Sequence, residues 1–332
     1  MKALVYTNPT ELTYRDEPEP VPEVGEALIK VDAAGICGSD MHAFHGHDER
    51  RYPPLILGHE VSGVIVGGSR DGEAVVVNPL MTCGTCDACL DGRSNLCANR
   101  QIIGMNPREG AFAQYLRMPE RNLVSMPQRM NPVHAAAAEP VATAWHAVAV
   151  ATRASARPVA ECKALVLGAG AVGLAVGLVL HLGGCRKIRI GDTNEFRRAT
   201  AKVAGCGDVY DPIGDPAPEP NGYDIVIDAV GGKVTRGVAV AAAKPGGVIV
   251  HIGLMDNDGG LDIRKITLQE ISFIGTYTYT MVDFRATVAA LHSGALGDLA
   301  WVEARPLAEG HSAFLDLDAG RTPAAKIVLV PD

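Results

Sequence analysis

Hydrophobic residues change their spacing near residue 131 and divide the chain into two regions. In the first region, short apolar runs are separated by Gly and Pro, a pattern that is typical of β-strands. Strands are predicted over residues 2–6, 26–33, 61–66, 73–77 and 112–117. The first region is therefore expected to form a compact, β-rich barrel.

The second region opens with an Ala-rich predicted helix over residues 132–152 and then alternates between strands and helical or turn segments. Its strands are predicted over residues 164–167, 187–191, 209–210, 224–228, 247–252 and 271–275. Alternation of this kind predicts an α/β domain with a doubly wound parallel sheet. Residues 211–221 are expected to form a loop, and a last strand over residues 325–330 is expected to return to the first region.

Composition and charge narrow the class of protein. A chain of 332 residues, of which 47% are hydrophobic, is long enough for two domains with buried cores. The net charge of -8 argues against a nucleic-acid partner or an anionic membrane surface. No apolar run predicts a signal peptide or a membrane-spanning helix. We therefore expect a cytoplasmic protein that acts on a small molecule.

Four cysteines lie within fifteen residues, at Cys83, Cys86, Cys89 and Cys97. Spacings of two residues let consecutive thiolates converge on one tetrahedral zinc ion, and the longer last step lets the chain turn back with the fourth sulfur. Disulfides are the alternative, but such short spacings suit them poorly and nothing indicates export. This segment is predicted to hold a structural zinc ion.

A glycine-rich turn follows the predicted strand over residues 164–167 and precedes an apolar helical stretch, which is the order of a dinucleotide-binding motif. Asp192 ends the next strand, where its carboxylate would accept hydrogen bonds from a ribose and repel a 2′-phosphate, so NAD is favoured over NADP. Arg197 weakens that preference. The alternative is a glycine turn without a ligand. The expected cofactor-binding residues are Gly168, Gly170, Ala171, Val172, Gly173, Asp192 and Arg197.

A second metal site is predicted from residues that are far apart in the sequence. Cys37, His59, Glu60 and Glu139 supply one sulfur, one nitrogen and one or two carboxylate oxygens. Each residue alone is weak evidence, because a buried Cys often serves as a small apolar side chain and a His-Glu pair is often structural. Together they predict an open, catalytic type of zinc site.

These motifs, in this order along the chain, resemble the zinc-dependent medium-chain dehydrogenase/reductase (alcohol dehydrogenase) family. Glu139 resembles its polyol, sugar-alcohol and threonine branch. The resemblance implies a GroES-like catalytic domain over residues 1–140 with a structural zinc lobe, a Rossmann domain over residues 141–281 and a return segment over residues 282–332. It also implies a homodimer or homotetramer.

The resemblance further implies that the protein oxidises a secondary alcohol of a polyol or sugar alcohol to a ketone, with zinc acidifying the hydroxyl and NAD taking the hydride. Ser39 resembles the family's first proton acceptor and His42 the residue that passes the proton outward. Ser39 as a helix cap and His42 as an exposed histidine are the alternatives. In relatives either carboxylate, here Glu60 or Glu139, contacts zinc. Asp40 is expected to orient His59.

The alternative substrates are threonine and butanediol. A zinc-free reductase of the same fold is disfavoured, because such relatives lack the metal ligands that this chain retains. A catalytically inactive NAD-binding relative is disfavoured as well, because it has no need for an open metal site beside Ser39 and His42. Sorbitol itself is disfavoured, because Thr278 stands where mammalian-type sorbitol dehydrogenases place a substrate-contacting Arg. The substrate pocket is expected to include Phe44, Phe112, Tyr277 and Tyr279.

Overall fold

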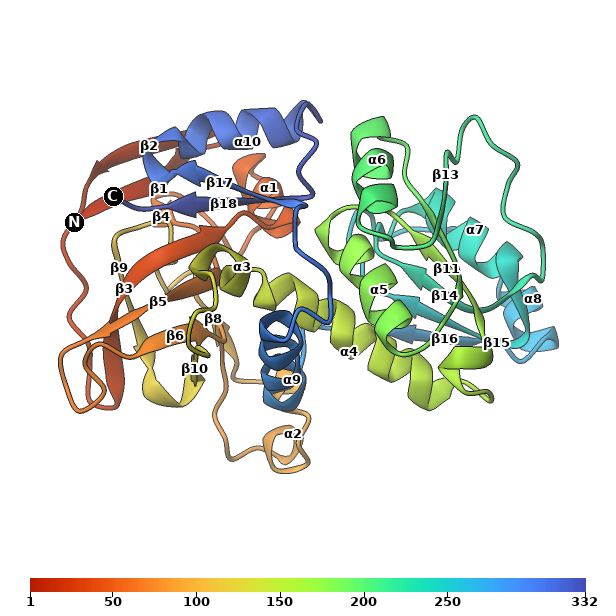
Figure 1. Ribbon diagram of the computed structural model, residues 1–332, viewed down its shortest axis with the longest axis horizontal. Coiled ribbons are helices and arrows are strands. Elements are labelled where there is room, and N and C mark those ends of the chain that lie inside the picture. Colours follow the sequence, from red (N-terminus) through yellow and green to blue (C-terminus); the bar gives the residue numbers. More distant parts are fainter.

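The chain forms two lobes, one with three sheets and one with a single sheet, and helix α4 (Ala138–Ala154) runs from between them along the second lobe (Figure 1). The computed structural model describes residues 1–332. Both chain termini lie in the first lobe, which holds β1 to β10 together with β17 and β18; the second lobe holds β11 to β16. No helix combines the length and the apolar character that a membrane span requires.

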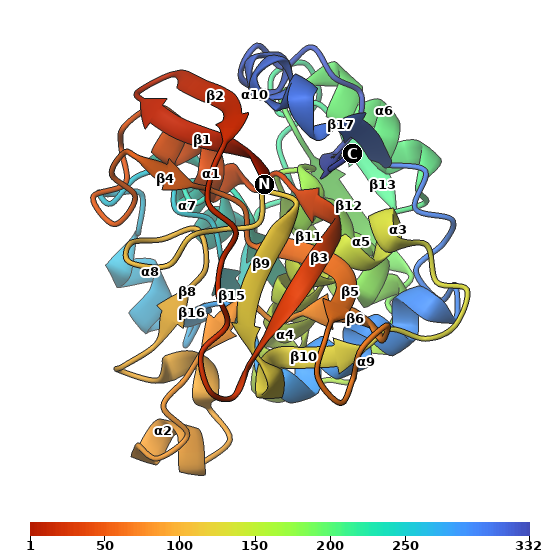
Figure 2. The same cartoon turned by 90° about the vertical axis from the view of Figure 1, so that its left-hand side faces the viewer.

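The first lobe contains a seven-stranded sheet and two smaller sheets. In the seven-stranded sheet, six strands follow the order β10-β6-β5-β3-β18-β17, and the seventh, β9, pairs with β3. Figure 2 shows this lobe facing the viewer, with α2 projecting away from its sheets. Its strands are β1 (Lys2–Asn8), β2 (Glu11–Asp16), β3 (Glu26–Gly35), β4 (Leu55–Ile56), β5 (Glu60–Val66), β6 (Ala74–Val77), β7 (Leu80–Met81), β8 (Gln101–Ile102), β9 (Tyr115–Pro119), β10 (Leu123–Ser125), β17 (Val302–Pro306) and β18 (Lys326–Val330).

Short helices complete the first lobe: α1 (Gly38–Phe44), α2 (Asp87–Leu90), α3 (Pro132–Ala136), α10 (Gly310–Asp318) and three 3₁₀ turns (Ser94–Leu96, Glu120–Asn122, Leu307–Glu309). Four of the five strands predicted here are confirmed, while the one predicted over residues 112–117 begins only at Tyr115. Phe112 and Ala113 precede that strand and are buried in the core. The sequence analysis missed β2 and β17. It also missed strands of two residues, such as β4 and β7, which are too short to show an alternating pattern.

The second lobe contains the predicted parallel sheet, with strand order β13-β12-β11-β14-β15-β16. Its pairings are all parallel, for example Ala164 opposite Ile225 and Ile188. The strands are β11 (Lys163–Leu167), β12 (Lys187–Gly191), β13 (Asp208–Tyr210), β14 (Tyr223–Asp228), β15 (Ala243–His251) and β16 (Ser272–Gly275). The remaining helices are α5 (Ala171–Leu182), α6 (Glu195–Val203), α7 (Lys233–Ala242), α8 (Ile263–Leu268), α9 (Met281–His292) and a 3₁₀ turn (Val159–Glu161).

Helices cover both faces of this sheet, which confirms the predicted doubly wound fold. Successive residues of β11 point to opposite faces: Ala164 and Val166 pack in the core that includes α4 and α5, whereas Leu165 and Leu167 pack in the core that includes α7. A strand that is buried on both faces needs a continuous apolar run, and the sequence of β11 provides one. The predicted loop over residues 211–221 is also confirmed.

The helix predicted over residues 132–152 is interrupted at Ala137, which ends α3 and precedes α4. Asn131 caps α3 by accepting a hydrogen bond from the Val133 N–H. Pro140 lies in the first turn of α4, and it has no N–H to donate to the carbonyl four residues earlier. The interruption is therefore a consequence of the proline, and it starts a new helix immediately before Glu139.

The last strand returns to the first lobe, as predicted: β18 pairs with β3, with Val328 opposite Gly35. A buried ion pair fastens it there. Lys326 is only 2% exposed and Glu60, on β5, is 0% exposed. The Lys326 ammonium donates to the Glu60 carboxylate at 2.6 Å and to the Ile36 carbonyl at 2.7 Å.

Gly168 and Gly173 allow the turn between β11 and α5 to close tightly. Gly168 has a φ of +93°, which favours glycine, and a Cβ on Gly173 would overlap the carbonyl oxygen of Gly168. Gly170 differs from both, because no atom lies within 4 Å of the position that its Cβ would take. The turn therefore uses glycine for packing at two positions and leaves open space at the third.

In the metal-free protein, we expect Lys326→Met to lower the free energy of unfolding by about 3 kcal/mol, because it leaves the Glu60 carboxylate buried without a cation. Urea unfolding of the purified protein measures this. Adding Glu60→Gln to Lys326→Met removes the unpaired charge and should recover part of the loss. If Lys326→Met alone is as stable as the wild type, the ion pair between Lys326 and Glu60 does not hold β18 in place.

Gly173→Ala should lower stability by about 1–3 kcal/mol, since the added methyl group forces α5 away from the end of β11. Gly170→Ala is the matched control, because its methyl group enters open space and its φ of -66° suits alanine. Thermal unfolding of both variants decides the matter. Equal melting temperatures would contradict the proposed packing role of Gly173.

Candidate active site

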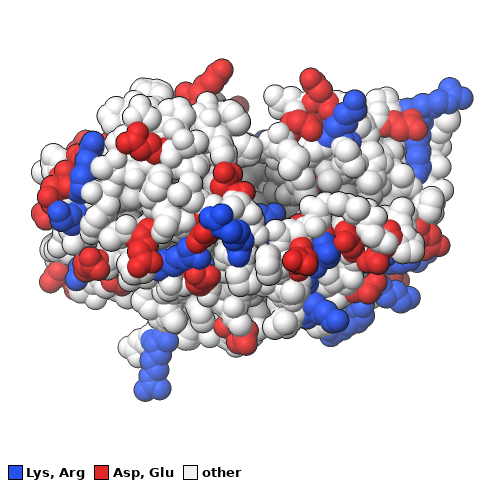
Figure 3. Space-filling model, turned by 90° about the horizontal axis from the view of Figure 1, so that it is seen from above, with Lys and Arg blue, Asp and Glu red and all other residues white.

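A cleft of about 250 Å³ lies between the lobes and brings both groups of predicted site residues together. Figure 3, which looks down on the molecule from above, shows the hollow between the two halves. From the first lobe it is lined by Cys37, Glu60 and Lys326, and from the second lobe by Gly170, Ala171, Val172, Gly173 and Arg197. The predicted metal ligands thus face the predicted dinucleotide turn across one cleft.

Cys37, His59 and Glu60 form the metal-binding group on the first-lobe side. One ligand atom from each lies within 4.8 Å of the others. Gly35, at the end of β3, makes room for this arrangement, because a Cβ there would overlap the Glu60 carboxylate. The Glu60 Oε2 atom is buried without a hydrogen-bond partner. A sulfur, a nitrogen and an unpaired carboxylate oxygen that converge in this way fit a zinc ion.

Asp40 supports His59 from behind. It is fully buried in the first turn of α1, where one of its oxygens accepts a hydrogen bond from the Cys37 N–H at 3.0 Å. Its other oxygen lies 3.5 Å from His59 Nδ1. Burial alone would lower the pKa of His59, but the charges of Asp40 and Cys37 raise it well above its usual value. This carboxylate is therefore placed to orient the imidazole ring.

Glu139 lies near this group but outside it. It is in the first turn of α4, and its carboxylate accepts a hydrogen bond of 3.0 Å from the hydroxyl of Tyr279. Burial raises the pKa of Glu139 to about 7, with a further contribution from the nearby charge of Glu60 and an opposing one from His59. The structure thus places Glu60, and not Glu139, next to both Cys37 and His59.

Ser39 and His42 lie on α1, one turn apart, beside Cys37. The Ser39 hydroxyl accepts a hydrogen bond from Arg51, which the sequence analysis did not single out. His42 is exposed, and partial desolvation together with the charge of His47 lowers its pKa. An imidazole at the surface that stays neutral near pH 7 is able to accept a proton.

The sequence analysis missed three buried cations, Arg51, Arg236 and Lys326, of which Arg51 and Lys326 lie beside the predicted metal ligands and the proton path. Lys326 did carry a signal, because it is a single charge in the strand sequence Lys-Ile-Val-Leu-Val. Arg51 carried none, since it lies in a polar segment where a surface arginine is expected. Both side chains contact a predicted site residue, Glu60 and Ser39 respectively.

The four-cysteine segment forms a second metal-binding group at the tip of the first lobe. All its thiols are free, and Sγ atoms lie 3.5 Å apart between Cys83 and Cys97 and between Cys86 and Cys89. Zn–S bonds of about 2.3 Å in a tetrahedron would separate the sulfurs by about 3.8 Å. Backbone N–H groups of Thr85 and Cys86 lower the pKa of Cys83 to about 5, which favours the thiolate. These four residues therefore fit a closed zinc site.

The cysteine segment also contacts residues 277–279, the stretch of backbone whose Tyr279 side chain is hydrogen-bonded to Glu139. The Asn95 side chain donates to the Tyr277 carbonyl at 2.9 Å, and the Arg100 guanidinium lies 4.6 Å from the centre of the Tyr277 ring. Tyr279, two residues further on, donates its hydroxyl to Glu139. The outlying segment is thereby connected to the active-site carboxylate through three residues of backbone.

Asp192 holds the glycine turn in place. One of its carboxylate oxygens accepts a hydrogen bond from the Ala169 N–H at 2.8 Å, and the other accepts one from the Asn194 N–H at 2.9 Å. Arg197 lies 3.9 Å away and is partly exposed. The turn and the carboxylate expected to contact a ribose are therefore a single hydrogen-bonded unit.

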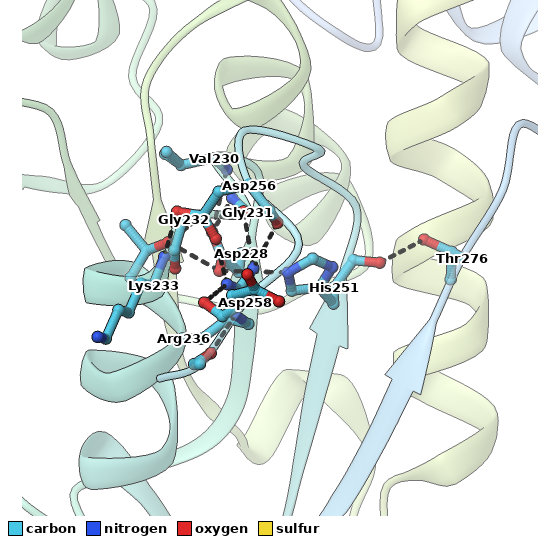
Figure 4. Close-up of polar contacts among 12 residues, drawn as sticks. Asp228, Val230, Gly231, Gly232, Lys233, Arg236, His251, Asp256, Asp258 and Thr276 are labelled. Carbon is cyan, nitrogen blue, oxygen red and sulfur yellow. Dashed lines mark hydrogen bonds and ion pairs between the residues drawn. The ribbon is translucent and has the colours of Figure 1, made fainter. Parts of the chain in front are cut away.

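The carboxyl ends of β14 and β15 form the adjoining wall, and Figure 4 shows its polar contacts. Asp228 accepts hydrogen bonds from the N–H groups of Val230 and Gly231 and from a threonine hydroxyl of α7. Buried Arg236 donates to the carbonyls of Gly231 at 2.9 Å and Gly259 at 2.7 Å. These contacts join the loop after β15 to the loop after β14, and Val230 of the latter loop packs against Gly168 of the glycine turn.

Part of the predicted substrate pocket is wrong. Phe44 and Phe112 are completely buried in the first-lobe core, where their ring centres lie 5.3 and 6.0 Å from that of Phe314. Phe112 also packs where a side chain on Gly58 would otherwise lie. Tyr279 is also buried, at 1% exposed, but its hydroxyl reaches the carboxylate of Glu139.

Two family models match the chain: the alcohol dehydrogenase GroES-like domain over residues 23–128 and the zinc-binding dehydrogenase over residues 171–293. The first match covers the segment that supplies Cys37, His59 and Glu60, as well as the four cysteines. The second covers the part of the second lobe that follows β11, from α5 to α9, including β12 to β16.

Similar proteins span nearly the same length. L-galactonate-5-dehydrogenase from Escherichia coli (strain K12) is 31% identical over 301 residues, covering 86% of this chain and 85% of the relative. Sorbitol dehydrogenase from Bacillus subtilis (strain 168) is 33% identical over 298 residues, covering 84% and 82%. A solved structure of a short chain alcohol dehydrogenase from Escherichia coli CFT073, complexed with cofactor NADH, has a TM-score of 0.89 at 26% identity and covers 99% of both chains. As its motifs predicted, the chain belongs to the zinc-dependent medium-chain dehydrogenase/reductase (alcohol dehydrogenase) family.

Proposed function

We propose that this protein oxidises a secondary alcohol of a polyol, sugar alcohol or related small molecule to a ketone and passes the hydride to NAD. One observation carries the proposal: the cleft that is lined by Cys37 and Glu60 is also lined by Gly170 of the dinucleotide turn. Hydride transfer requires the reacting alcohol and the nicotinamide to meet within one enclosed site. Relatives named for L-galactonate and sorbitol support a polyhydroxylated substrate.

Cys37, His59 and Glu60 would hold the catalytic zinc ion, with Glu139 as the alternative carboxylate. A zinc ion bound there would lower the pKa of the substrate hydroxyl toward neutrality. Asp40 keeps the imidazole of His59 oriented, and Lys326 balances the charge of Glu60. We also propose that the catalytic domain consists of residues 1–140 and 282–332, and the NAD-binding domain of residues 141–281. The return segment then belongs to the catalytic domain, to which its strand β18 supplies Lys326.

Ser39 would accept the substrate proton, and His42 would pass it to solvent. Both lie on α1, which begins immediately after Cys37, and His42 is exposed at the surface. Its lowered pKa keeps the ring neutral and ready to accept a proton near pH 7. A path of two side chains would therefore connect the buried reaction centre to water.

The residues of the glycine turn, Gly168, Gly170, Ala171, Val172 and Gly173, would hold the cofactor pyrophosphate at the N-terminus of α5. When bound, NAD would supply the hydride acceptor. Asp192 favours NAD over NADP, because its carboxylate repels a 2′-phosphate, although Arg197 lies close to it.

Assembly into a homodimer or homotetramer belongs to the same proposal. Strand β16 is at one edge of the second-lobe sheet, where its free side can pair with a second copy. We propose no nucleic-acid or membrane partner and a cytoplasmic location.

The wild-type protein should form NADH, measured by absorbance, with sugar alcohols or sugar acids that carry a free secondary hydroxyl, and should form NADPH more slowly. A preference for threonine or 2,3-butanediol would favour the alternative function, a threonine or butanediol dehydrogenase. Binding of NADH without turnover of any alcohol in the panel would instead support an inactive NAD-binding protein.

Metal analysis should find two zinc ions per chain. Cys37→Ser should retain one, keep the fold, and lose more than about a hundredfold in activity, since even the outer partners of zinc ligands contribute up to about that factor. Cys162→Ser is the matched control, because that buried thiol lies outside both metal-binding groups. Full activity in a Cys37→Ser protein that has lost a zinc ion would end the assignment.

A further inference from the structure

Arg51 is a buried cation that ends a polar segment after α1. It is 1% exposed, and each nitrogen of its guanidinium group donates a hydrogen bond. Nη1 contacts the carboxylate of Asp48 at 2.7 Å, which balances the charge. Charge balance accounts for only one of these contacts. Two others end on a single residue, Ser39: Nη1 donates to its carbonyl oxygen at 3.0 Å and Nη2 to its hydroxyl oxygen at 3.2 Å.

The bond to the Ser39 hydroxyl decides how that group can act. A serine hydroxyl has one hydrogen to donate and two lone pairs with which to accept. A guanidinium group can only donate, so it occupies one lone pair and the hydroxyl hydrogen must point elsewhere. One lone pair and one hydrogen of the hydroxyl remain free. A hydroxyl that relays a proton needs both, because the lone pair receives one proton and the hydrogen is the proton released.

The surroundings of Arg51 hold this geometry rigidly. Nε donates to the Gly104 carbonyl at 2.9 Å. Gly104 in turn lies against Gly58, since a Cβ on Gly104 would be 3.1 Å from the Gly58 backbone nitrogen. Gly58 directly precedes His59. The guanidinium group therefore ties the start of α1 to the segment that carries a predicted zinc ligand.

We propose that Arg51 is a positioning residue for the proton path: it fixes the Ser39 hydroxyl so that this group accepts from the substrate side and donates outward. The inference rests on the proposed function, because Ser39 has a proton to carry only if an alcohol is oxidised. Arg51 itself touches neither substrate nor cofactor in this role. Its contribution is to orient the hydroxyl through two donors that lysine, with its single flexible ammonium group, does not reproduce.

A double-mutant cycle tests this role. Arg51→Met should lower kcat by roughly ten- to a hundredfold, since misplacing a reacting group by about 1 Å has effects of that size. The Michaelis constant for the alcohol and the dissociation constant for NADH, measured by fluorescence titration, should change little. In the Ser39→Ala background the same substitution should change kcat by less than about twofold, because contacting residues that act together are not additive.

Three further readouts separate positioning from a structural role. The solvent deuterium isotope effect on kcat should rise in Arg51→Met, since proton transfer then limits the rate. Arg51→Lys keeps the charge beside Asp48, so its melting temperature should recover toward that of the wild type while kcat stays low. Arg50→Met is the matched control: Arg50 also binds Asp48, at 3.0 Å, but does not contact Ser39, and its loss should leave kcat unchanged.

The outcomes are distinguishable. An active wild type whose kcat falls by the same factor on Arg51→Met with and without Ser39 overturns the role of Arg51 alone. Recovery of both kcat and stability by Arg51→Lys overturns it as well, because charge is then sufficient. A wild type that forms no NADH with any alcohol contradicts the proposed function, and the inference fails with it.

Discussion

The structure depends on balancing charges that are buried where the two lobes meet. Asp40, His59 and Glu60 are buried, and isolated charges at such depth would be strongly destabilising. Asp40 accepts a hydrogen bond from the Cys37 N–H and lies 3.5 Å from the His59 imidazole, and Glu60 is paired with Lys326, which arrives from the far end of the chain. The return of β18 to the first lobe is therefore more than the completion of a sheet, because it brings the cation that makes a carboxylate tolerable beside the cleft.

Features that are local in the sequence could be predicted, because local spacing determines their geometry. The four cysteines and the glycine turn with Asp192 each lie within a short stretch, and the structure brings the atoms of each group together. The parallel sheet was predictable for a similar reason: strands that are buried on both faces, such as β11, need continuous apolar runs.

Features that depend on the meeting of distant segments were harder to predict. Nothing in the segment around Arg51 distinguishes it from a surface arginine, because its partners Ser39 and Gly104 are brought to it only by the fold. Phe44 and Phe112 were expected in the pocket because aromatic residues often line one, but the same residues fill a core equally well. The Pro140 interruption of the Ala-rich helix, in contrast, was available from the sequence and was overlooked.

The contact between the cysteine segment and Tyr277 has a consequence for durability. Asn95 and Arg100 hold the stretch of backbone that carries Tyr279 to Glu139, although the cysteines lie at the periphery of the molecule. Chemical damage to those outlying sulfurs, for example by peroxide, would release this stretch and disturb the carboxylate from a distance. The lifetime of the enzyme under oxidative stress would then be set by a region that never meets the substrate.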